Sequence, residues 1–254
     1  MKKMKFAVCL AALAVVFGFS SCLDSDDSNY PSYQASVTVT GDDVMGYTFY
    51  ADNGSILVPT SQSAMQAQGL KKIKRAVIAF DLVDGTSGQN LESGKRYNIV
   101  LHPNYSQGIP TYDVIDRHNN AAADTLVNNQ DPIHEMSGLF VKNGYATLGI
   151  SFQISQTGPF YMNVGYDSSK DVDVAGKTLT LHLYYDQNSK NAYQVVSSLF
   201  SFRMPEKEMY NFSSASATDS IDVVLKTKAN DYGASVDKEL KCRMAVRDFM
   251  TPRY

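Results

Sequence analysis

The amino-acid sequence predicts an all-β protein with two domains, a small N-terminal barrel and a C-terminal antiparallel β-sandwich. Three observations predict this class. Tyr and Phe, which favour half-buried pleated surfaces, occur 16 and 12 times, whereas Trp is absent. Short segments of alternating apolar and polar residues follow one another, with Gly, Asn and Asp between them. No long amphipathic helix is visible anywhere in the chain.

The N-terminus has the parts of an export signal. Lys2, Lys3 and Lys5 form a positive region, and residues 6–19 are almost uninterruptedly apolar or small. This run is too short for a membrane-spanning helix, which needs about 20 residues. We therefore expect residues 1–21 to be a signal peptide that is removed, rather than a permanent anchor.

The residues Phe19-Ser20-Ser21-Cys22 at the end of this run resemble the lipobox of bacterial lipoproteins. In that family the peptidase cleaves before the cysteine, which carries a diacylglycerol on its thiol and an acyl chain on its new amine. The resemblance implies that Cys22 is the lipid attachment site. The alternative is an ordinary secretory signal with a chance cysteine. Several acyl chains anchor a protein stably where a single chain is marginal, so the mature protein would stay on a membrane.

Residues 22–33 are expected to form a disordered acidic tether, because Leu23-Asp24-Ser25-Asp26-Asp27-Ser28 cannot build a core. The segment also resembles the acidic export signal that sends lipoproteins of the Bacteroidetes to the outer face of their outer membrane. A generic solvated linker fits it equally well. We therefore expect a lipid-anchored protein of the outer membrane, with surface-exposed and periplasmic orientations both open.

Composition limits the partners and the bonds that hold the chain together. Cleavage before Cys22 leaves 233 of the 254 residues, and the loss of three lysines takes the formal net charge from −3 to −6. This balance argues against nucleic acid, because phosphate contacts need clustered Lys and Arg. The densest basic run, residues 71–75, is interpreted as a solvated strand entry. Cys242 would be the only free thiol, so no intramolecular disulfide can form.

Residues 34–116 are predicted to form the first domain. Asn53-Gly54 lies between two β-like runs and indicates a hairpin, because a type I′ turn needs positive φ at both central residues. Short antiparallel strands in such number are typical of a small barrel such as the five-stranded OB type. We expect the strands at 34–40, 47–51, 55–59, 72–83, 95–102 and, as the last of the barrel, 111–115.

The remaining residues divide into a connector and a second domain. Residues 117–131 contain four Asn, no aromatic residue and no alternation, so they are predicted to connect the domains. Residues 132–248 contain about seven further strands. Two of them flank a second Asn-Gly turn at 143–144, and in another, Thr178–Tyr184, leucines alternate with polar residues. This number of strands with polar turns suggests a β-sandwich.

Several segments, in this order, carry a resemblance to a known family: the lipobox with its acidic tail, and residues 47–59, 94–100, 131–136 and 143–152. The layout resembles the NigD-like lipoproteins of Bacteroides and related bacteria. The segments are turn and strand patterns, so the match is specific through their order. The resemblance implies an OB-like domain followed by a β-sandwich in an envelope lipoprotein. It implies no established activity and assigns no functional residue.

No catalytic signature occurs in the sequence. There is no nucleophile elbow, no phosphate-binding loop and no nucleotide fingerprint. We therefore expect neither an enzyme nor a cofactor. The four histidines share no metal-ligand spacing and are interpreted as surface residues: His102, His118, His134 and His182.

Two weaker site candidates remain. Asp167, Asp171 and Asp173 place carboxylates along one loop, and hard cations such as calcium favour these oxygens. The loop lacks the central Gly and the distant Glu of an EF-hand, so exposed turn aspartates are the preferred interpretation. Asp124-Thr125-Leu126 resembles the O-glycosylation acceptor of the Bacteroidetes, which makes Thr125 a candidate acceptor in the connector.

The leading hypothesis is a non-catalytic envelope lipoprotein that presents a binding surface to an unknown envelope protein or glycan. In an OB-type barrel this surface would be one face with flanking loops, here residues 47–59 with the loops 60–75 and 85–94. Another hypothesis is an enzyme whose carboxylates come together only in the folded protein. The alternative to the leading hypothesis is a glycan-binding lipoprotein of a polysaccharide uptake system, with these tyrosines as stacking candidates: Tyr105, Tyr112, Tyr184 and Tyr185.

Overall fold

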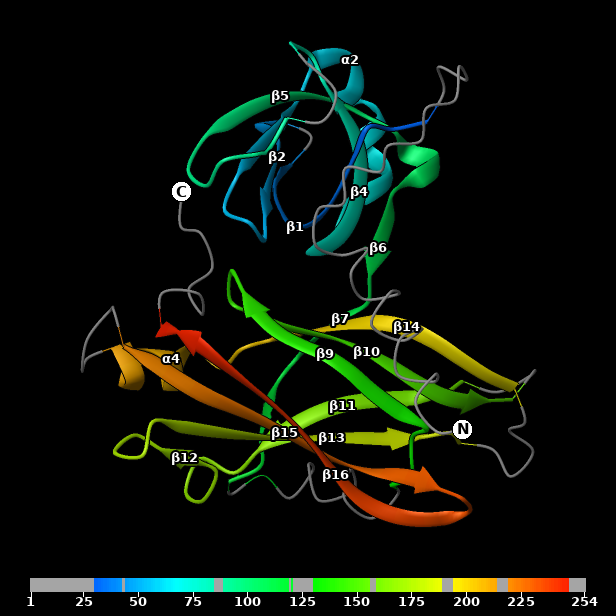
Figure 1. Cartoon of the computed structure of the whole chain (residues 1–254), viewed down its shortest axis with the longest axis vertical. Coiled ribbons are helices and arrows are strands. Elements are labelled where there is room, and N and C mark those ends of the chain that lie inside the picture. Colours follow the sequence, from blue (N-terminus) through cyan, green and yellow to red (C-terminus); the bar gives the residue numbers. More distant parts are fainter. Residues whose placement is uncertain are drawn as a thin grey trace, which may run out of the picture. The chain divides into compact units, whose positions relative to one another are not determined.

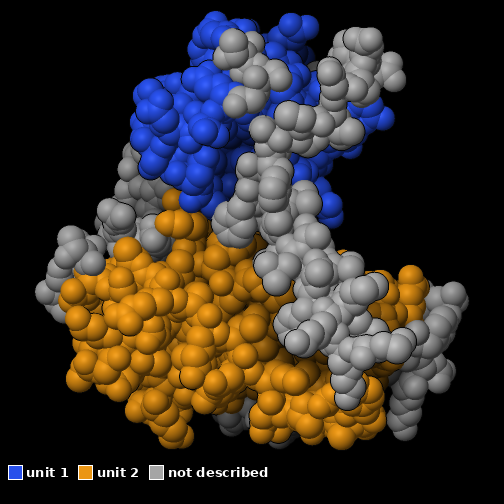
Figure 2. Space-filling model, in the orientation of Figure 1, with its two compact units in different colours: residues 1–110 blue, residues 111–254 orange. Residues whose placement is uncertain are grey.

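The fold was analysed in a computed structural model, which describes residues 30–42, 44–84, 89–118, 120, 130–155, 159–188, 194–213 and 219–246. The chain divides into two compact units, Met1–Pro110 and Thr111–Tyr254 (Figure 2). Both are built from β-strands, which confirms the predicted all-β class. The predicted signal peptide, Cys22 and Thr125 lie outside the described residues. Within the described ranges, every helix is too short or too polar to cross a membrane.

Unit 1 contains a closed five-stranded barrel. Its strands follow the order β1-β2-β3-β5-β4, and β1 pairs with β4 to close the ring (Figure 1). Closure includes a parallel pair, β3 with β5, so the barrel is not wholly antiparallel as predicted. The strands are β1 (Tyr33–Asp42), β2 (Gly46–Ala51), β3 (Ile56–Pro59), β4 (Arg75–Leu82), β5 (Arg96–Leu101) and β6 (Gln107–Ile109), which extends the sheet beyond β4.

A short helical segment completes the barrel core. α2 (Ser61–Ala64) and η1 (Gln66–Leu70) join β3 to β4, and the Thr60 hydroxyl caps α2 by accepting from the Ser63 amide. Ala67 and Leu70 are buried among the barrel's apolar side chains. Residues 60–75 are therefore partly core, and their part in a binding surface stays a prediction. A second short turn, η2 (Pro103–Tyr105), follows β5.

The two Asn-Gly turns differ. β2 and β3 form the predicted hairpin, but only Gly54 of the turn has positive φ, at 89°, so the turn is not type I′. The Asn53 side chain accepts a hydrogen bond from the Ser55 amide at 2.9 Å instead. At the second turn Asn143 and Gly144 have φ values of 52° and 81°, as a type I′ turn requires.

Unit 2 consists of two β-sheets, which Figure 1 shows as two layers. Sheet I contains β7 (Thr111–Asp113), β14 (Gln194–Arg203), β10 (Tyr145–Ile154) and β9 (Glu135–Lys142). Sheet II contains β16 (Ala234–Ala245), β15 (Ser220–Asp231), β13 (Thr178–Asp186), β11 (Tyr161–Tyr166) and β8 (Ile115–Asp116), with β12 (Val172–Asp173) beside β13. The helix α4 (Glu206–Ser213) follows β14.

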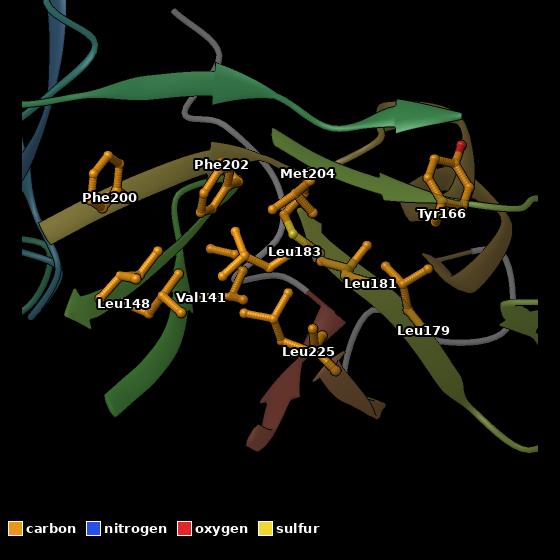
Figure 3. Close-up of a cluster of buried hydrophobic side chains, with 14 of the residues drawn as sticks. Val141, Leu148, Tyr166, Leu179, Leu181, Leu183, Phe200, Phe202, Met204 and Leu225 are labelled. Carbon is orange, nitrogen blue, oxygen red and sulfur yellow. The ribbon is translucent and has the colours of Figure 1, made fainter. Parts of the chain in front are cut away.

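One apolar core lies between the two sheets. Figure 3 shows Leu148 and Phe202 of sheet I in the same cluster as Leu181 and Leu183 of sheet II. The leucines of β13 alternate with polar residues, as predicted, because one face of the strand is buried and the other is not. Three strand pairs are parallel, so the sandwich is mixed rather than purely antiparallel: β7 with β14, β8 with β11, and β13 with β15.

The chain divides after Pro110, earlier than the predicted end of the first domain at residue 116. β7 pairs with β14 and β8 with β11, so residues 111–116 belong to the sandwich and not to the barrel. The predicted connector 117–131 also lies in unit 2, where the Arg117 amide donates to the Tyr166 carbonyl at 2.7 Å. Its residues 121–129 lie outside the described part of the chain.

Candidate functional site

A groove of about 260 Å³ opens on the face of sheet II that points away from the core. Its side chains come from three neighbouring strands, β13, β15 and β16, and from the chain after β8 and before β9. Eight residues line it: Arg117, Gln130, His182, Tyr184, Lys226, Thr227, Lys228 and Asp237.

Strand register arranges the groove in two rows across the sheet. In the first row Gly165 of β11 lies beside His182 of β13, and His182 lies beside Lys226 of β15. Lys226 in turn lies beside Glu239 of β16. Because neighbouring strands are about 4.8 Å apart, the backbone of Lys226 is roughly 10 Å from that of Gly165. The second row contains Asn163 beside Tyr184, and Lys228 beside Asp237.

Arg117 lies across the start of the first row. A Cβ added to Gly165 would stand 3.2 Å from Arg117 Cδ and 3.3 Å from its Cγ, closer than an ordinary contact. The missing side chain at Gly165 therefore leaves room for the stem of Arg117. The guanidinium carbon is 5.4 Å from the centroid of the Tyr184 ring, a cation–π arrangement.

The two terminal nitrogens of Arg117 are the donors that a ligand can use. Its Nε is buried and has no hydrogen-bond partner, and its guanidinium makes no hydrogen bond to another residue in the described ranges. A buried donor without a partner is unfavourable, because it has lost its water and gained nothing in exchange.

The side chains of His182 and Tyr184 form the floor of the groove, among the cationic side chains that line it. His182 Nε2 lies 3.2 Å from Asp171 Oδ2, and the His182 and Tyr184 rings stack with centroids 6.4 Å apart. Tyr184 is almost fully buried. Burial raises the pKa of the Tyr184 hydroxyl, although the Arg117 charge opposes the shift. The hydroxyl is therefore protonated at neutral pH.

Positive charge predominates among the side chains that line the groove. Lys228 Nζ is 2.6 Å from Asp237 Oδ1, so this lysine is neutralised in part. Lys226 is exposed and forms no ion pair with any residue that the structure describes. Among the lining side chains three permanent cations thus face one carboxylate, while two further carboxylates lie next to the groove, Asp171 beside His182 and Glu239 beside Lys226. Such a local concentration of one charge attracts ligands of the opposite charge.

The calcium candidate has a different structure from a metal site. The Asp167 carboxylate accepts from the Ser169 amide at 2.9 Å, Asp171 from the Asp167 amide at 2.8 Å, and Asp173 from the Gly176 amide at 2.7 Å. Hydrogen bonds from Ser169 hold the pKa of Asp167 well below its usual range. Each carboxylate thus stabilises its own turn. In the described parts of the chain no group of three or more His, Cys, Asp and Glu could hold a metal ion.

The four candidate stacking tyrosines lie in different surroundings. Tyr185 belongs to the sandwich core and is 1 % exposed, and Tyr184 lies beneath Arg117. Tyr105 and Tyr112 are 46 % and 37 % exposed. The Tyr105 ring is 6.0 Å from that of Tyr30, which is also exposed, so unit 1 carries one exposed aromatic pair.

Sequence reasoning did not identify the groove. It assigned Arg117 to a connector and gave no role to Lys226 or Lys228. These residues come together for two reasons. β13 and β15 pair in a fixed register, and β8, which directly precedes Arg117, pairs with β11 of the same sheet.

An OB-like barrel followed by a mixed β-sandwich places the chain in a class of two-unit, all-β proteins. No protein-family model matches the chain, and no curated protein matches it. Solved structures do match it, and three of them illustrate the similarity. They are a protein described as toxin-related from Parabacteroides distasonis (TM-score 0.59, 14 % identity, 85 % of this chain and 94 % of that one), one described as a lipoprotein from Bacteroides fragilis (0.56, 13 %, 87 % and 99 %) and a NigD-like immunity protein from Bacteroides caccae (0.55, 17 %, 82 % and 93 %).

These identities show a shared fold and nothing more. Within that limit the fold agrees with the resemblance to the NigD-like family, because the similarity extends over both units of the chain and nearly the whole of each solved structure.

Proposed function

We propose that this chain is a non-catalytic lipoprotein of the outer membrane, attached through Cys22. Its body carries a binding surface for an envelope protein or a glycan. The observation that carries the proposal is the groove on sheet II, where Arg117 and Lys226 offer unpaired donors above a Tyr184 floor. The shared fold with a protein described as a lipoprotein and the lipobox-like sequence support the anchor.

The arrangement of histidines favours binding over catalysis. Three histidines lie beside aspartates, as in a catalytic triad: His102 with Asp81 at 2.6 Å, His118 with Asp167 at 3.5 Å, and His182 with Asp171 at 3.2 Å. In the described ranges no Ser, Thr or Cys side chain hydrogen-bonds to any of these imidazoles, so no pair has an activated nucleophile. Burial raises the pKa of the Cys242 thiol to about 12, so this residue is not a thiolate at neutral pH.

Metabolic labelling tests the anchor. The full chain is expressed in a Gram-negative host that is fed an alkyne-tagged fatty acid, together with Cys22→Ser and the matched control Cys242→Ser. We expect the label in the wild-type protein and in the control, and its loss in Cys22→Ser. Label retained in Cys22→Ser, or an unmodified wild-type cysteine by mass spectrometry, would contradict the proposal. Protease treatment of intact cells then distinguishes surface display from a periplasmic orientation.

A glycan-binding lipoprotein is the second function we consider, and the exposed pair Tyr30 and Tyr105 favours it. Exposed aromatic rings can stack on sugar faces, since they present apolar area with a polar edge. A glycan array with the wild-type chain and Tyr105→Ala tests this function. Loss of a bound glycan in the variant supports it, and the absence of any bound glycan excludes it.

A further inference from the structure

We propose that the groove on sheet II binds a hydroxylated carboxylate about the size of one sugar ring, the chemistry of a uronic acid. Arg117 and Lys226 hold the carboxylate, and Asp237 and Gln130 accept hydrogen bonds from the hydroxyl groups. This inference rests on the proposed function, in which the groove is the binding surface, and it adds the class of ligand.

The cations of the groove select an anion. The guanidinium of Arg117 lies over Tyr184 of β13, and Lys226 projects from the adjacent strand β15. A carboxylate placed above β13 is therefore within reach of both side chains. The two terminal nitrogens of Arg117 offer a planar pair of donors that matches a carboxylate, and neither makes a hydrogen bond in the described part of the chain.

The remaining polar atoms select hydroxyl groups. Gln130 Nε2 donates to the Leu183 carbonyl at 3.2 Å, which leaves the Gln130 side-chain oxygen to accept. Asp237 uses Oδ1 for Lys228, and its side chain is 85 % exposed, so its second oxygen is open to a donor. Carboxylate and amide oxygens that face a ligand need donors on that ligand. A bare hydrocarbon acid has none, whereas a sugar acid has several.

The dimensions of the groove limit the ligand to a small unit. Its volume of about 260 Å³ lies just below the range of roughly 300–1,000 Å³ in which drug-sized molecules bind. The Tyr184 ring cannot act as a stacking platform, since the Arg117 guanidinium already occupies its face. Recognition therefore depends on charge and hydrogen bonds, and one ring or the end of a chain fits.

Saturation-transfer NMR and equilibrium dialysis with the full mature lipoprotein in detergent micelles test the proposal. The probes are glucuronate and galacturonate, with glucose, which lacks the carboxylate, and tetrahydropyran-2-carboxylate and cyclohexanecarboxylate, which lack the hydroxyls. We expect millimolar or tighter binding of a uronate, weakened by salt because the charges are exposed. We expect glucose and cyclohexanecarboxylate to bind at least about tenfold more weakly.

Variants assign the binding to the groove. Arg117→Ala and Lys226→Gln should each weaken uronate binding about tenfold or more, and the exposed control Lys238→Gln should not change it. Arg117→Lys keeps the charge but loses the paired donors, so an intermediate loss is expected. Unchanged melting curves show that a loss of binding does not reflect unfolding, and Lys226→Gln, an exposed change, gives a second independent result.

Each outcome decides the question. No binding of either uronate at millimolar concentration overturns the inference, as does equal binding of glucose or unchanged affinity in both groove variants. Neutral-sugar binding would leave the proposed function intact and refute only the ligand class. A failure of fatty-acid labelling at Cys22 would refute the proposed anchor, and the uronate affinities would still show whether the groove is a site.

Discussion

The guanidinium of Arg75 and the carboxylate of Asp52 form a paired ion bridge inside the barrel, with Nη1–Oδ1 and Nη2–Oδ2 both at 2.7 Å. Arg75 is fully buried at the start of β4, and its Nη1 also donates to the Thr38 hydroxyl at 3.0 Å. Asp52 begins the turn between β2 and β3. The bridge therefore links the turn between β2 and β3 to the start of β4, which follows more than twenty residues later in the chain.

Removing one partner of this bridge should destabilise unit 1 strongly. Asp52→Ala leaves the buried Arg75 charge without its counter-charge, and such a change costs about 3–5 kcal/mol. Replacing both partners, as in Asp52→Leu with Arg75→Met, removes the buried charges together and should restore much of the loss. The measurement is the free energy of unfolding from urea titrations, compared between variants whose free energies depend on urea concentration with the same slope.

An exposed ion pair of the same unit provides the control. Lys95 Nζ is 2.6 Å from Glu92, but both side chains are more than half exposed, so Lys95→Ala should change the free energy of unfolding very little. An Asp52→Ala effect as small as that of Lys95→Ala would show that the buried bridge is not essential to the barrel.

Asp81 should contribute to the acid sensitivity of the protein. It accepts from the Ser32 amide at 2.7 Å and lies 2.6 Å from His102 Nε2. Burial raises the pKa of the Asp81 carboxyl, but the hydrogen bonds from Ser32 and His102 outweigh burial and lower it. A carboxyl with a lower pKa in the folded state stabilises the fold above its unfolded pKa, about 4, and this contribution disappears as pH falls through the folded value.

Asp81→Asn should therefore flatten the decline in stability on the acid side of pH 4. The measurement is the free energy of unfolding as a function of pH for the wild type, for Asp81→Asn and for a control, Asp84→Asn. Asp81 lies in β4, and Asp84 is an exposed aspartate just after the end of that strand. If Asp81→Asn followed the wild-type curve below pH 4, the hydrogen bonds of Asp81 would not contribute to the acid response.

Local patterns predicted the strands and hairpins, but not the partners of isolated strands. Residues 143–144 form the expected turn because its geometry depends on two adjacent residues. Residues 111–115 show a strand pattern, and the structure pairs them with β14 and β11 rather than with the barrel. A strand pattern specifies which face is buried, whereas the partner is determined by contacts far along the chain.

Charge was also interpreted from local context alone. The basic run 71–75 appears solvated in the sequence, yet Arg75 is buried because Asp52, more than twenty residues earlier, neutralises it. The groove has the same property, since Arg117, Lys226 and Asp237 come together only through strand register. Sequence alternation indicated the two faces of β13, but no local signal identified its neighbours.

Tyr232 occupies an unfavourable backbone conformation at the tip of the β15–β16 hairpin. Its φ is 52° and that of Gly233 is 90°, the pattern of a type I′ turn, in which Asn or Gly is preferred to a bulky residue. The side chain is fully exposed, so its replacement removes no packing. Tyr232→Asn should raise the stability of unit 2 by about 1 kcal/mol.

Thermal unfolding of the variant measures this gain. Tyr210→Asn serves as the control, because Tyr210 is also exposed but lies in α4, where the backbone has no such strain. Only the Tyr232 variant should unfold at a higher temperature. A lower melting temperature for Tyr232→Asn would mean that the tyrosine makes a favourable interaction that its exposure does not reveal.

Gly165→Ala should disturb the groove without removing any of its polar groups. The added Cβ would lie 3.2 Å from the Ile115 carbonyl and from Arg117 Cδ, closer than ordinary contacts. The carbonyl belongs to the backbone of β8, so the flexible arginine stem is the group that must move. We expect Arg117 to leave the Tyr184 ring and uronate affinity to fall, with a smaller loss of stability. Gly69→Ala is the control, because nothing lies within 4 Å of its added Cβ. Unchanged affinity in Gly165→Ala, with Arg117 still over Tyr184 in a crystal structure, would show that the glycine does not position the arginine.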